Sequence, residues 1–355
     1  MHSRLARLRS QMREHGLDAF VVSSIPNIRY LTGFTGSNGL CVVTRYHAAF
    51  LTDPRYAQQS KDEVRGVQRH VVHGGLFDAA VNLGILKRSG TVGFESDELP
   101  HEQYRRLRRL LKGARLSPTL RLVEELSLVK DSVELACIRR AVRITEHVYR
   151  DILRLLKPGV TEKDIAAEIS YRHRRYGADR DAFEPIVASG PRSAFPHATP
   201  TARKIRNRET VILDFGCRVN GYGSDLTRTV AVGAVRPKSA EMYAVVRTAQ
   251  RLAIAAVRAG MKASDLDAVA RDSIRKAGYG KYFSHSLGHG LGLRVHELPR
   301  ISALSKEVLQ KGSVITIEPG VYVPGYGGVR IEDDVVVGKD GCSVLTTSPQ
   351  KLMVV

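Results

Sequence analysis

The spacing of hydrophobic residues in the first third of the chain predicts a small domain of mixed strands and helices. Short apolar runs typical of buried strands lie at residues 19–24, 41–44, 48–52 and 91–95. Helical patterns cover residues 1–16 and 101–113, and Asp-Pro-Arg-Tyr at 53–56 predicts a turn that leads into another helix. Because strand-like and helix-like segments alternate, we expect an α/β domain over residues 1–127.

A long helical pattern marks the start of a second region. It predicts one helix between a cap at Asp131 or Ser132 and a stop at Lys157–Gly159, where Pro158 cannot continue a helix. We therefore place a domain boundary after residue 127 and expect a second domain over residues 128–355.

This second region contains an internal repeat. The segment KPGVTEKDIAAEI, from Lys157, resembles RAGMKASDLDAVA, from Arg258, and VILDFG resembles VITIEPG. Four pairs of positions keep a spacing of 101 or 104 residues: Gly159 with Gly260, Gly177 with Gly278, Asp214 with Glu318, and Gly221 with Gly325. Each half is therefore predicted to run helix, helix, strand, Gly-Tyr-Gly turn and strand.

The repeat also predicts where a group of acids lies. Asp214 and Asp225 flank the turn of the first half, and Glu318 and Glu332 flank the turn of the second. Two halves that face each other across a pseudo-twofold axis would bring the four carboxylates together. An acid inside an apolar run is costly to bury unless a cation or a donor meets it. One such acid is equally compatible with capping a strand end, but two at equivalent positions favour a shared site.

Histidines extend this group of candidates. His289 lies between two glycines, and one imidazole among carboxylates suits a divalent cation. His296 is a candidate donor to a developing oxyanion. His285 is expected to be structural or to support a ligand, because the nearby glycines argue against a zinc-binding helix. His197, taken by itself, is typical of a surface loop.

Neighbouring residues suggest how the acids are held. Arg330 lies two positions before Glu332 on one strand face and is expected to support a ligating carboxylate. Thr227 shares a face with Asp225 and is a candidate to orient it, whereas Thr229 is expected only to fill the strand. Asp333 and Asp334 are expected to be exposed hairpin acids.

These residue types indicate a hydrolase. Two close divalent ions can activate a water and polarise a carbonyl together. The sequence lacks the H-E-x-x-H, G-x-S-x-G and Walker patterns of competing enzyme classes.

Composition narrows the class of protein without changing this picture. The 355 residues, 43% of them hydrophobic, suffice for two domains, and the net charge of +19 is spread along the chain. The basic stretch at 104–115 predicts a solvated amphipathic helix. A nucleic-acid patch is the alternative, but no nucleic-acid motif accompanies it. Four scattered cysteines, no signal-peptide pattern and no spanning apolar run predict a cytoplasmic protein without membrane contact.

Several motifs together resemble one enzyme family. The segments GYGSDLTRT, GHGLGLRVHELP, TIEPGVYV and GGVRIEDD resemble signatures of the prolidase and aminopeptidase P family of dinuclear metallopeptidases. The stretch GLDAFVVSSIPNIRYLTGFTGSNG resembles the family's creatinase-type N-terminal domain, and the ending VLTTSPQKLMVV also fits. The resemblance covers nearly the whole chain. It implies an α+β protein in which a creatinase-type α/β domain over 1–127 precedes an internally duplicated pita-bread catalytic domain over 128–355.

The resemblance also implies roles for individual residues. Two divalent ions per subunit, Mn²⁺ by expectation with Co²⁺ or Zn²⁺ as alternatives, would be held by Asp214, Asp225, His289, Glu318 and Glu332. Asp225 and Glu332 would bridge the two ions. The expected catalytic set is His197, His296, Glu318 and Arg330. In it, Glu318 accepts the proton of the attacking water, and the two histidines contact the scissile peptide. A homodimer is also implied.

The implied substrates are peptides with proline in the second position. The X-Pro bond lacks an amide hydrogen and has a fixed φ, so ordinary peptidases fail there. Arg294 stands where the family often has an acid, and we interpret it as the partner of a dipeptide's free carboxylate. An outward-facing strand arginine is an equally compatible interpretation.

We therefore expect an Xaa-Pro dipeptidase that acts on Xaa-Pro dipeptides or short peptides. An Xaa-Pro aminopeptidase that acts on longer peptides is the alternative. A non-catalytic pita-bread binding protein is a more distant one, because all five ligand positions are filled.

Overall fold

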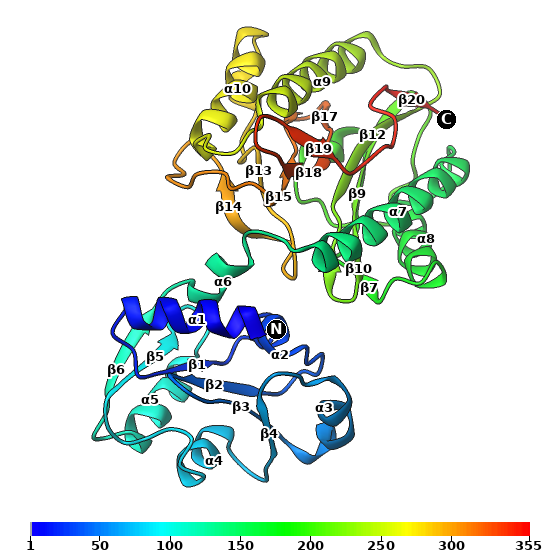
Figure 1. The fold of residues 1–355 in the computed structure, drawn as a ribbon. Coiled ribbons are helices and arrows are strands. Elements are labelled where there is room, and N and C mark those ends of the chain that lie inside the picture. The colour runs from blue at the N-terminus through cyan, green and yellow to red at the C-terminus, as the bar shows by residue number, and fades with distance from the viewer. Residues whose placement is uncertain (1) are drawn as a thin grey trace. The chain divides into compact units, whose positions relative to one another are not determined.

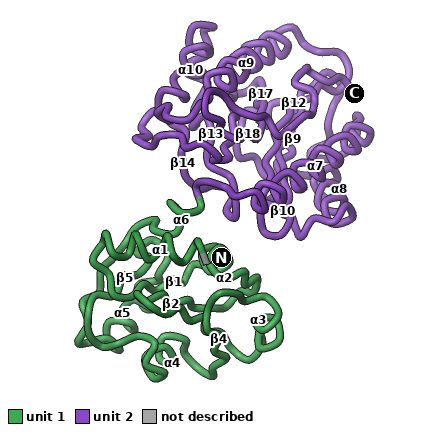
Figure 2. The backbone as a smooth tube through the Cα atoms, in the orientation of Figure 1, with its two compact units in different colours: residues 1–127 green, residues 128–355 purple. Residues whose placement is uncertain are grey.

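The computed structural model describes residues 2–355, and the chain divides into two compact units between Ser127 and Leu128 (Figure 2). Each unit has its own sheets and its own hydrophobic core. Among the helices of residues 2–355, none combines the length and the apolar character needed to cross a membrane.

Unit 1 is built on one mixed sheet of six strands in the order β4-β3-β2-β1-β5-β6 (Figure 1). The strands are β1 (Ala19–Val22), β2 (Leu40–Thr44), β3 (Ala48–Thr52), β4 (Gln68–Val71), β5 (Thr91–Glu95) and β6 (Arg115–Thr119). Strand β1 runs antiparallel to β2 and parallel to β5, so the sheet combines a meander with crossover connections.

Helices join the strands of unit 1. They are α1 (His2–Glu14), α2 (Ile25–Thr32), the short 3₁₀ helix η1 (Pro54–Tyr56), α3 (Ala57–Glu63), α4 (Leu76–Asn82), α5 (His101–Leu110) and α6 (Leu122–Ser127). The basic helix α5 is amphipathic as predicted: Leu107, and Leu111 just after the helix, are buried in the core of unit 1, while the arginines of α5 are exposed. It ends at Leu110, three residues before the predicted end.

The first half of unit 2 begins with the long helix α7 (Ser132–Leu155). Asp131 is its cap and accepts from the backbone N–H groups of Val133 and Glu134, at 3.0 and 2.9 Å. The elements that follow are α8 (Glu162–Arg175), β7 (Arg180–Asp181), β8 (Ile186–Ser189), η2 (Gly190–Ala194), β9 (Glu209–Phe215), β10 (Cys217–Val219), β11 (Tyr222–Gly223) and β12 (Leu226–Val232).

The second half repeats this order and ends in a C-terminal segment. Its elements are α9 (Pro237–Ala256), α10 (Ala263–Lys276), η3 (Gly280–Tyr282), β13 (Gly288–Gly290), β14 (Glu297–Ile301), β15 (Val314–Ile317), β16 (Gly320–Val323), β17 (Gly327–Arg330), β18 (Asp333–Val337), β19 (Cys342–Val344) and β20 (Met353–Val354). Strand β20 returns to the first half and pairs in parallel with β12.

The repeat seen in the sequence is also a repeat of backbone conformation. Gly159 and Gly260 have φ of 96° and 82°, and Gly221 and Gly325 have φ of 78° and 74°, a region that favours glycine. Their hydrogen bonds correspond as well. The N–H of Gly159 donates to Ile205, and that of Gly260 donates to Leu309, both at 2.9 Å. Each helix pair is thus joined in the same way to the segment that precedes β9 or β15.

Each half of unit 2 has its own apolar core. Helices α7 and α8 pack on β9 and β12 around Tyr149, Ile169 and Phe215. Helices α9 and α10 cover β15 and β18 around Val246, Leu266 and others. The main sheets of the two halves are β20-β12-β9-β8 and β14-β13-β15-β18-β19. These packed layers fix the strand ends that carry the candidate ligands.

Candidate metal centre and active site

Paired strands present the four acids. Asp214 lies near the end of β9, which pairs with β12, and Asp225 directly precedes β12. Glu318 directly follows β15, which pairs with β18, and Glu332 directly precedes β18. Each half therefore supplies one acid from either arm of an antiparallel pair.

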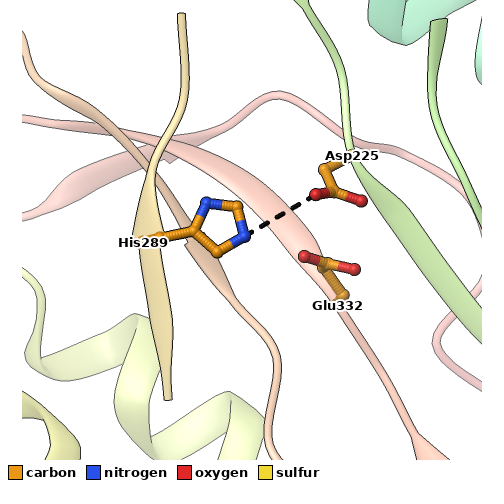
Figure 3. Close-up of side chains that lie close together, drawn as sticks. All are labelled: Asp225, His289 and Glu332. Carbon is orange, nitrogen blue, oxygen red and sulfur yellow. Dashed lines mark ion pairs between the residues drawn. The ribbon is translucent and has the colours of Figure 1, made fainter. Parts of the chain in front are cut away.

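His289 and two of the acids, Asp225 and Glu332, form one buried cluster (Figure 3). Ligand atoms of Asp225, His289 and Glu332 all lie within 4.8 Å of one another, and the three residues are buried. The Nε2 atom of His289 lies 3.7 Å from Asp225 Oδ2 and 3.4 Å from Glu318 Oε1. Residues that are far apart in the sequence thus converge on one point.

The hydrogen bonds of His289 leave one nitrogen for a cation. Its Nδ1 lies 3.1 Å from the carbonyl oxygen of Gly290, which can only accept a hydrogen bond. The proton therefore sits on Nδ1, and Nε2 turns its lone pair toward the carboxylates. Burial, and secondarily the neighbouring His296, lowers the pKa of His289 to about 3. A neutral imidazole held in this tautomer is the form that binds a metal.

The carboxylates are crowded and incompletely paired. Burial first, and then their mutual repulsion, raises the pKa values of Asp225 and Glu332 well above the ordinary range. Burial raises that of Glu318 to about 8. One buried oxygen each of Asp214, Asp225 and Glu332 has no hydrogen-bond partner among the described residues. Unpaired carboxylate oxygens around a neutral imidazole are the donor set expected for hard divalent ions.

Arg330 forms hydrogen bonds to Asp214 and to residues beside the cluster. It is 3% exposed, and its Nη2 donates to Asp214 Oδ2 at 2.5 Å. Its Nη1 donates to the Tyr322 hydroxyl at 2.7 Å and to the Pro196 carbonyl at 3.2 Å. Burial works against the charge of Arg330, but Tyr322, Asp214 and Glu318 outweigh it and raise its pKa. The arginine thus supports a candidate ligand, as its position in the sequence suggested.

Two threonines join the halves of unit 2. Thr227 Oγ1 donates to Glu332 Oε2 at 2.6 Å, and the Glu332 N–H donates to the Thr227 carbonyl at 3.0 Å. The Thr229 hydroxyl both donates to the Arg330 carbonyl and accepts from the Arg330 N–H, at 3.0 Å each. The expectation that Thr229 only fills the strand was wrong, because its hydroxyl pairs β12 with β17.

His296 and His197 lie at the edge of the cluster. His296 is exposed as a whole residue, but its ring lies against that of His289, with the two centroids 4.3 Å apart. His197 is exposed in the turn after η2, next to the Pro196 carbonyl that Arg330 contacts. Loss of surrounding water, followed by the charge of His197, lowers the pKa of His296. The two imidazoles are therefore close enough to influence each other at the edge of the cluster.

His285 stands apart from the candidate ligands. Its Nε2 lies 2.8 Å from the Tyr322 hydroxyl and its Nδ1 lies 2.8 Å from the Ser286 carbonyl. Burial lowers its pKa to about 3. Its position behind Tyr322, a partner of Arg330, fits the structural or supporting role expected from the sequence.

Arg294 lies in the segment between β13 and β14, two residues before His296. It is half-buried, and its backbone N–H donates to Glu297 Oε2 at 3.4 Å. Arg294 and His296 thus lie on the same segment between β13 and β14.

Asp333 and Asp334 correct one expectation from the sequence. Both are fully buried rather than exposed. Asp333 pairs with Arg228 at 2.6 Å, and Asp334 accepts from the Asp225 N–H at 3.0 Å. Sequence reasoning missed Arg228, although an arginine within the apolar strand LTRTVAV was a signal that a buried acid faces it.

These observations fit a site for divalent cations. Asp225, His289 and Glu332 bring ligand atoms close together, and one oxygen each of Asp214, Asp225 and Glu332 has no partner among the described residues. The second oxygens of Asp214 and Glu332 are held by Arg330 and Thr227. Asp214, Asp225, His289, Glu318 and Glu332 supply enough donors for two ions.

Comparisons with known proteins find similarity along nearly the whole chain. The model of metallopeptidase family M24 matches residues 136–339, and that of the creatinase/prolidase N-terminal domain matches residues 4–129. An Xaa-Pro dipeptidase of Pyrococcus furiosus is 35% identical over 99% of this chain and 100% of its own length.

Two solved structures share the fold of both units. An Xaa-Pro dipeptidase from Bacillus anthracis superposes with a TM-score of 0.95 at 38% identity, covering 100% of this chain and 99% of its own. An X-Pro aminopeptidase from Thermotoga maritima superposes with a TM-score of 0.88 at 35% identity, covering 98% and 100%.

Proposed function

The chain belongs to metallopeptidase family M24, and we propose that it is a metal-dependent Xaa-Pro dipeptidase. It has the family's two-part organisation, a creatinase-type domain followed by a duplicated catalytic domain. The observation that carries the proposal is the buried cluster of Asp225, His289 and Glu332 at the meeting point of the two halves. Its likeness in fold to an Xaa-Pro dipeptidase supports the substrate class.

In the proposed reaction, the metal ions and the protein side chains have separate roles. Two divalent ions, when bound by the five candidate ligands, would supply an activated water and polarise the peptide carbonyl. Glu318 is the candidate proton acceptor, because its carboxylate lies at the cluster, with Oε1 3.4 Å from Nε2 of His289. His296 is the candidate donor to the developing oxyanion, and His197 the second contact to the scissile peptide. Arg330 keeps Asp214 in place.

An Xaa-Pro aminopeptidase is the second candidate. It is favoured by the likeness to the Thermotoga maritima enzyme, which is nearly as similar in fold and sequence as the dipeptidase. The two activities differ in whether the proline carboxyl group is free. We propose that Arg294 binds this free carboxylate, since an arginine can pair with it through two charge-assisted hydrogen bonds.

Kinetics of Leu-Pro and of a Leu-Pro-Xaa tripeptide test this choice. The wild type is expected to prefer Leu-Pro. Arg294→Ala should raise KM for Leu-Pro about 10- to 100-fold, the equivalent of about 1.5–3 kcal/mol for hydrogen bonds to a charged group. Its effect on the tripeptide should be small.

Arg300→Ala is the matched control, because Arg300 is exposed on β14 and its loss changes the net charge equally. Its kinetics should remain those of the wild type. A wild-type preference for the tripeptide would overturn the dipeptidase proposal in favour of the aminopeptidase.

Three further features belong to the proposal. We propose Mn²⁺ as the metal, with Co²⁺ or Zn²⁺ as alternatives, because the donor set is mostly carboxylate with one imidazole. A homodimer follows from the family resemblance, and light scattering of the purified protein measures it. A cytoplasmic location fits the four free cysteines.

A further inference from the structure

A buried ion pair lies in unit 2 outside the ligand cluster. The Lys130 ammonium donates to Glu297 Oε1 and, at 3.3 Å, to the Leu128 carbonyl. Only 1% of the Lys130 side chain and 8% of the Glu297 side chain are exposed. Removing two charges from water is expensive, and an apolar pair of similar volume is often no less stabilising. A role in fixing local geometry is therefore a better explanation of this pair than stability alone.

The Glu297 carboxylate shapes the segment 291–297. Its Oε2 accepts from the Arg294 N–H at 3.4 Å. A Cβ atom added to Gly292 would lie 2.4 Å from Oε1, so the chain passes directly against the carboxylate. The Gly292 N–H donates to the Arg294 carbonyl at 3.0 Å and closes the turn. The segment that carries Arg294 and His296 is thus wrapped around Glu297.

The backbone of Lys130 is fixed to a second strand of the site. Its N–H donates to the Gly312 carbonyl at 3.0 Å, and Val129 forms a bridge with Ser313. Gly312 and Ser313 lead directly into β15, and Glu318 follows the end of that strand. Lys130 also directly precedes the cap of α7, whose capping box holds the chain on its other side.

We propose that Lys130, acting through Glu297, is a positioning residue that fixes Arg294 and His296 relative to Glu318. Its backbone is tied to the strand of Glu318, and its ammonium is tied to the carboxylate around which the other segment turns. The inference rests on the proposed function, which gives Arg294 and His296 their roles.

A double-mutant cycle on the Mn²⁺-loaded protein tests the proposal. Lys130→Met keeps the apolar stem and removes the charge, and Glu297→Gln removes the opposite charge. Each should raise KM for Leu-Pro and lower kcat, so that kcat/KM falls about 10- to 100-fold. In the double variant, kcat/KM should fall no further than in either single variant, because each substitution alone already removes the ion pair. Rates are compared at a temperature where circular dichroism shows every variant folded.

The control removes an ion pair between α7 and α8. Arg172→Met breaks the contact of Arg172 Nη1 with Asp151, which is 3.1 Å long and partly buried. It should cost stability without changing KM. A purely structural effect lowers the apparent kcat through loss of folded protein, whereas displacement of Arg294 raises KM.

Amide hydrogen exchange of residues 291–297 separates the positioning role of Lys130 from the proposed peptidase function. We expect faster exchange in Lys130→Met and not in Arg172→Met. If exchange rises but the wild type hydrolyses no Xaa-Pro peptide, the proposed function fails while the positioning role stands. If kcat, KM and exchange of Lys130→Met equal those of the wild type or of Arg172→Met, the positioning role is overturned.

Discussion

Arg330 connects four parts of the candidate site through one guanidinium group. It contacts Asp214, Tyr322 and Pro196, and its Nε donates to Thr227 Oγ1 at 3.1 Å. The strand alternation predicted that Arg330 supports a carboxylate. It did not predict Asp214, because the sequence does not reveal which strand of the other half faces β17.

Replacing Arg330 with lysine should weaken metal binding. A lysine ammonium is a point charge and cannot reproduce the planar fork that reaches Asp214, Tyr322 and Pro196 together. Loss of a partner that orients a ligand typically costs about 10- to 100-fold in metal affinity. Titration of Mn²⁺ into Arg330→Lys by calorimetry measures this. The exposed Arg300→Lys serves as the control, and equal affinity in both variants would refute the role given to Arg330.

Asp333 shows why runs of acids are difficult to interpret from sequence. Adjacent acids after a turn are typical of solvent-exposed hairpins, and nothing local distinguishes Asp333 from them. Its burial depends on Arg228, Thr346 and Gln350, which lie far from it or beyond the next strand. Only the tertiary structure brings these donors together.

At the level of elements, the loop that carries His197 depends on one carboxylate at the start of α8. Glu162 Oε1 accepts from the N–H and hydroxyl of Ser189, at 2.9 and 2.8 Å. Its Oε2 accepts from the N–H and hydroxyl of Thr201, at 3.0 and 2.8 Å, and from Arg192 Nε at 3.1 Å. Glu162 therefore closes the loop 189–201 at both ends.

The pH dependence of this contact has a definite sign. Burial pushes the pKa of Glu162 upward, but the donors of Ser189 and Thr201 outweigh it, and the pKa lies below its ordinary value. A carboxylate with a depressed pKa stabilises the fold above its unfolded pKa of about 4.3 and loses that contribution as the pH falls through the folded value.

Glu162→Gln should therefore lower the free energy of unfolding at pH 7 by about 1–3 kcal/mol, because buried donors lose their partner. The difference from the wild type should shrink below about pH 4.3. Urea unfolding of both proteins at pH 7 and pH 4 measures it, with the partly exposed Glu168→Gln on the same helix as the control. A difference that stays constant with pH would contradict the assignment.

The edge strands of unit 1 are among the elements that the hydrophobic pattern did not predict. Strand β4 (QRHV) and strand β6 (RLSPT) lie at the two edges of the sheet of unit 1 and are largely polar or partly exposed. Pro118 is tolerated in β6 because an edge strand can dispense with one N–H donor. Strands β1, β2, β3 and β5 are buried, which is why their apolar runs predicted them.

At the scale of the whole molecule, the internal repeat was the most informative feature of the sequence. It predicted the order of elements in each half and the pairing of strands that carry acids, and the fold class is confirmed by the family match. It did not predict how the halves are held together. That depends on contacts such as Thr227 with Glu332 and Arg228 with Asp333, which no local pattern encodes.

Arg228 links three parts of unit 2. It is 1% exposed, pairs with Asp333 of the second half, and donates to the Ser348 carbonyl of the C-terminal segment at 2.9 Å. Arg228→Met should lower the free energy of unfolding by about 3–5 kcal/mol, because it leaves Asp333 charged and buried without its cation.

The double variant Arg228→Met/Asp333→Asn should recover part of that loss, since the uncompensated charge is gone. Thermal and urea unfolding of the metal-loaded proteins measure both effects. Equal stability of Arg228→Met and the wild type would show that the pair does not hold the halves together.

The most direct test of the central claim is the rate of Leu-Pro hydrolysis during removal and return of the metal. Chelation should abolish hydrolysis by the wild type, and added Mn²⁺ should restore it. With added Mn²⁺, Asp225→Asn should hydrolyse Leu-Pro at least about 1000-fold more slowly than the wild type, because metal ions contribute several kcal/mol to such reactions. Hydrolysis that survives both chelation and Asp225→Asn would contradict a metal-dependent peptidase centred on Asp225, His289 and Glu332.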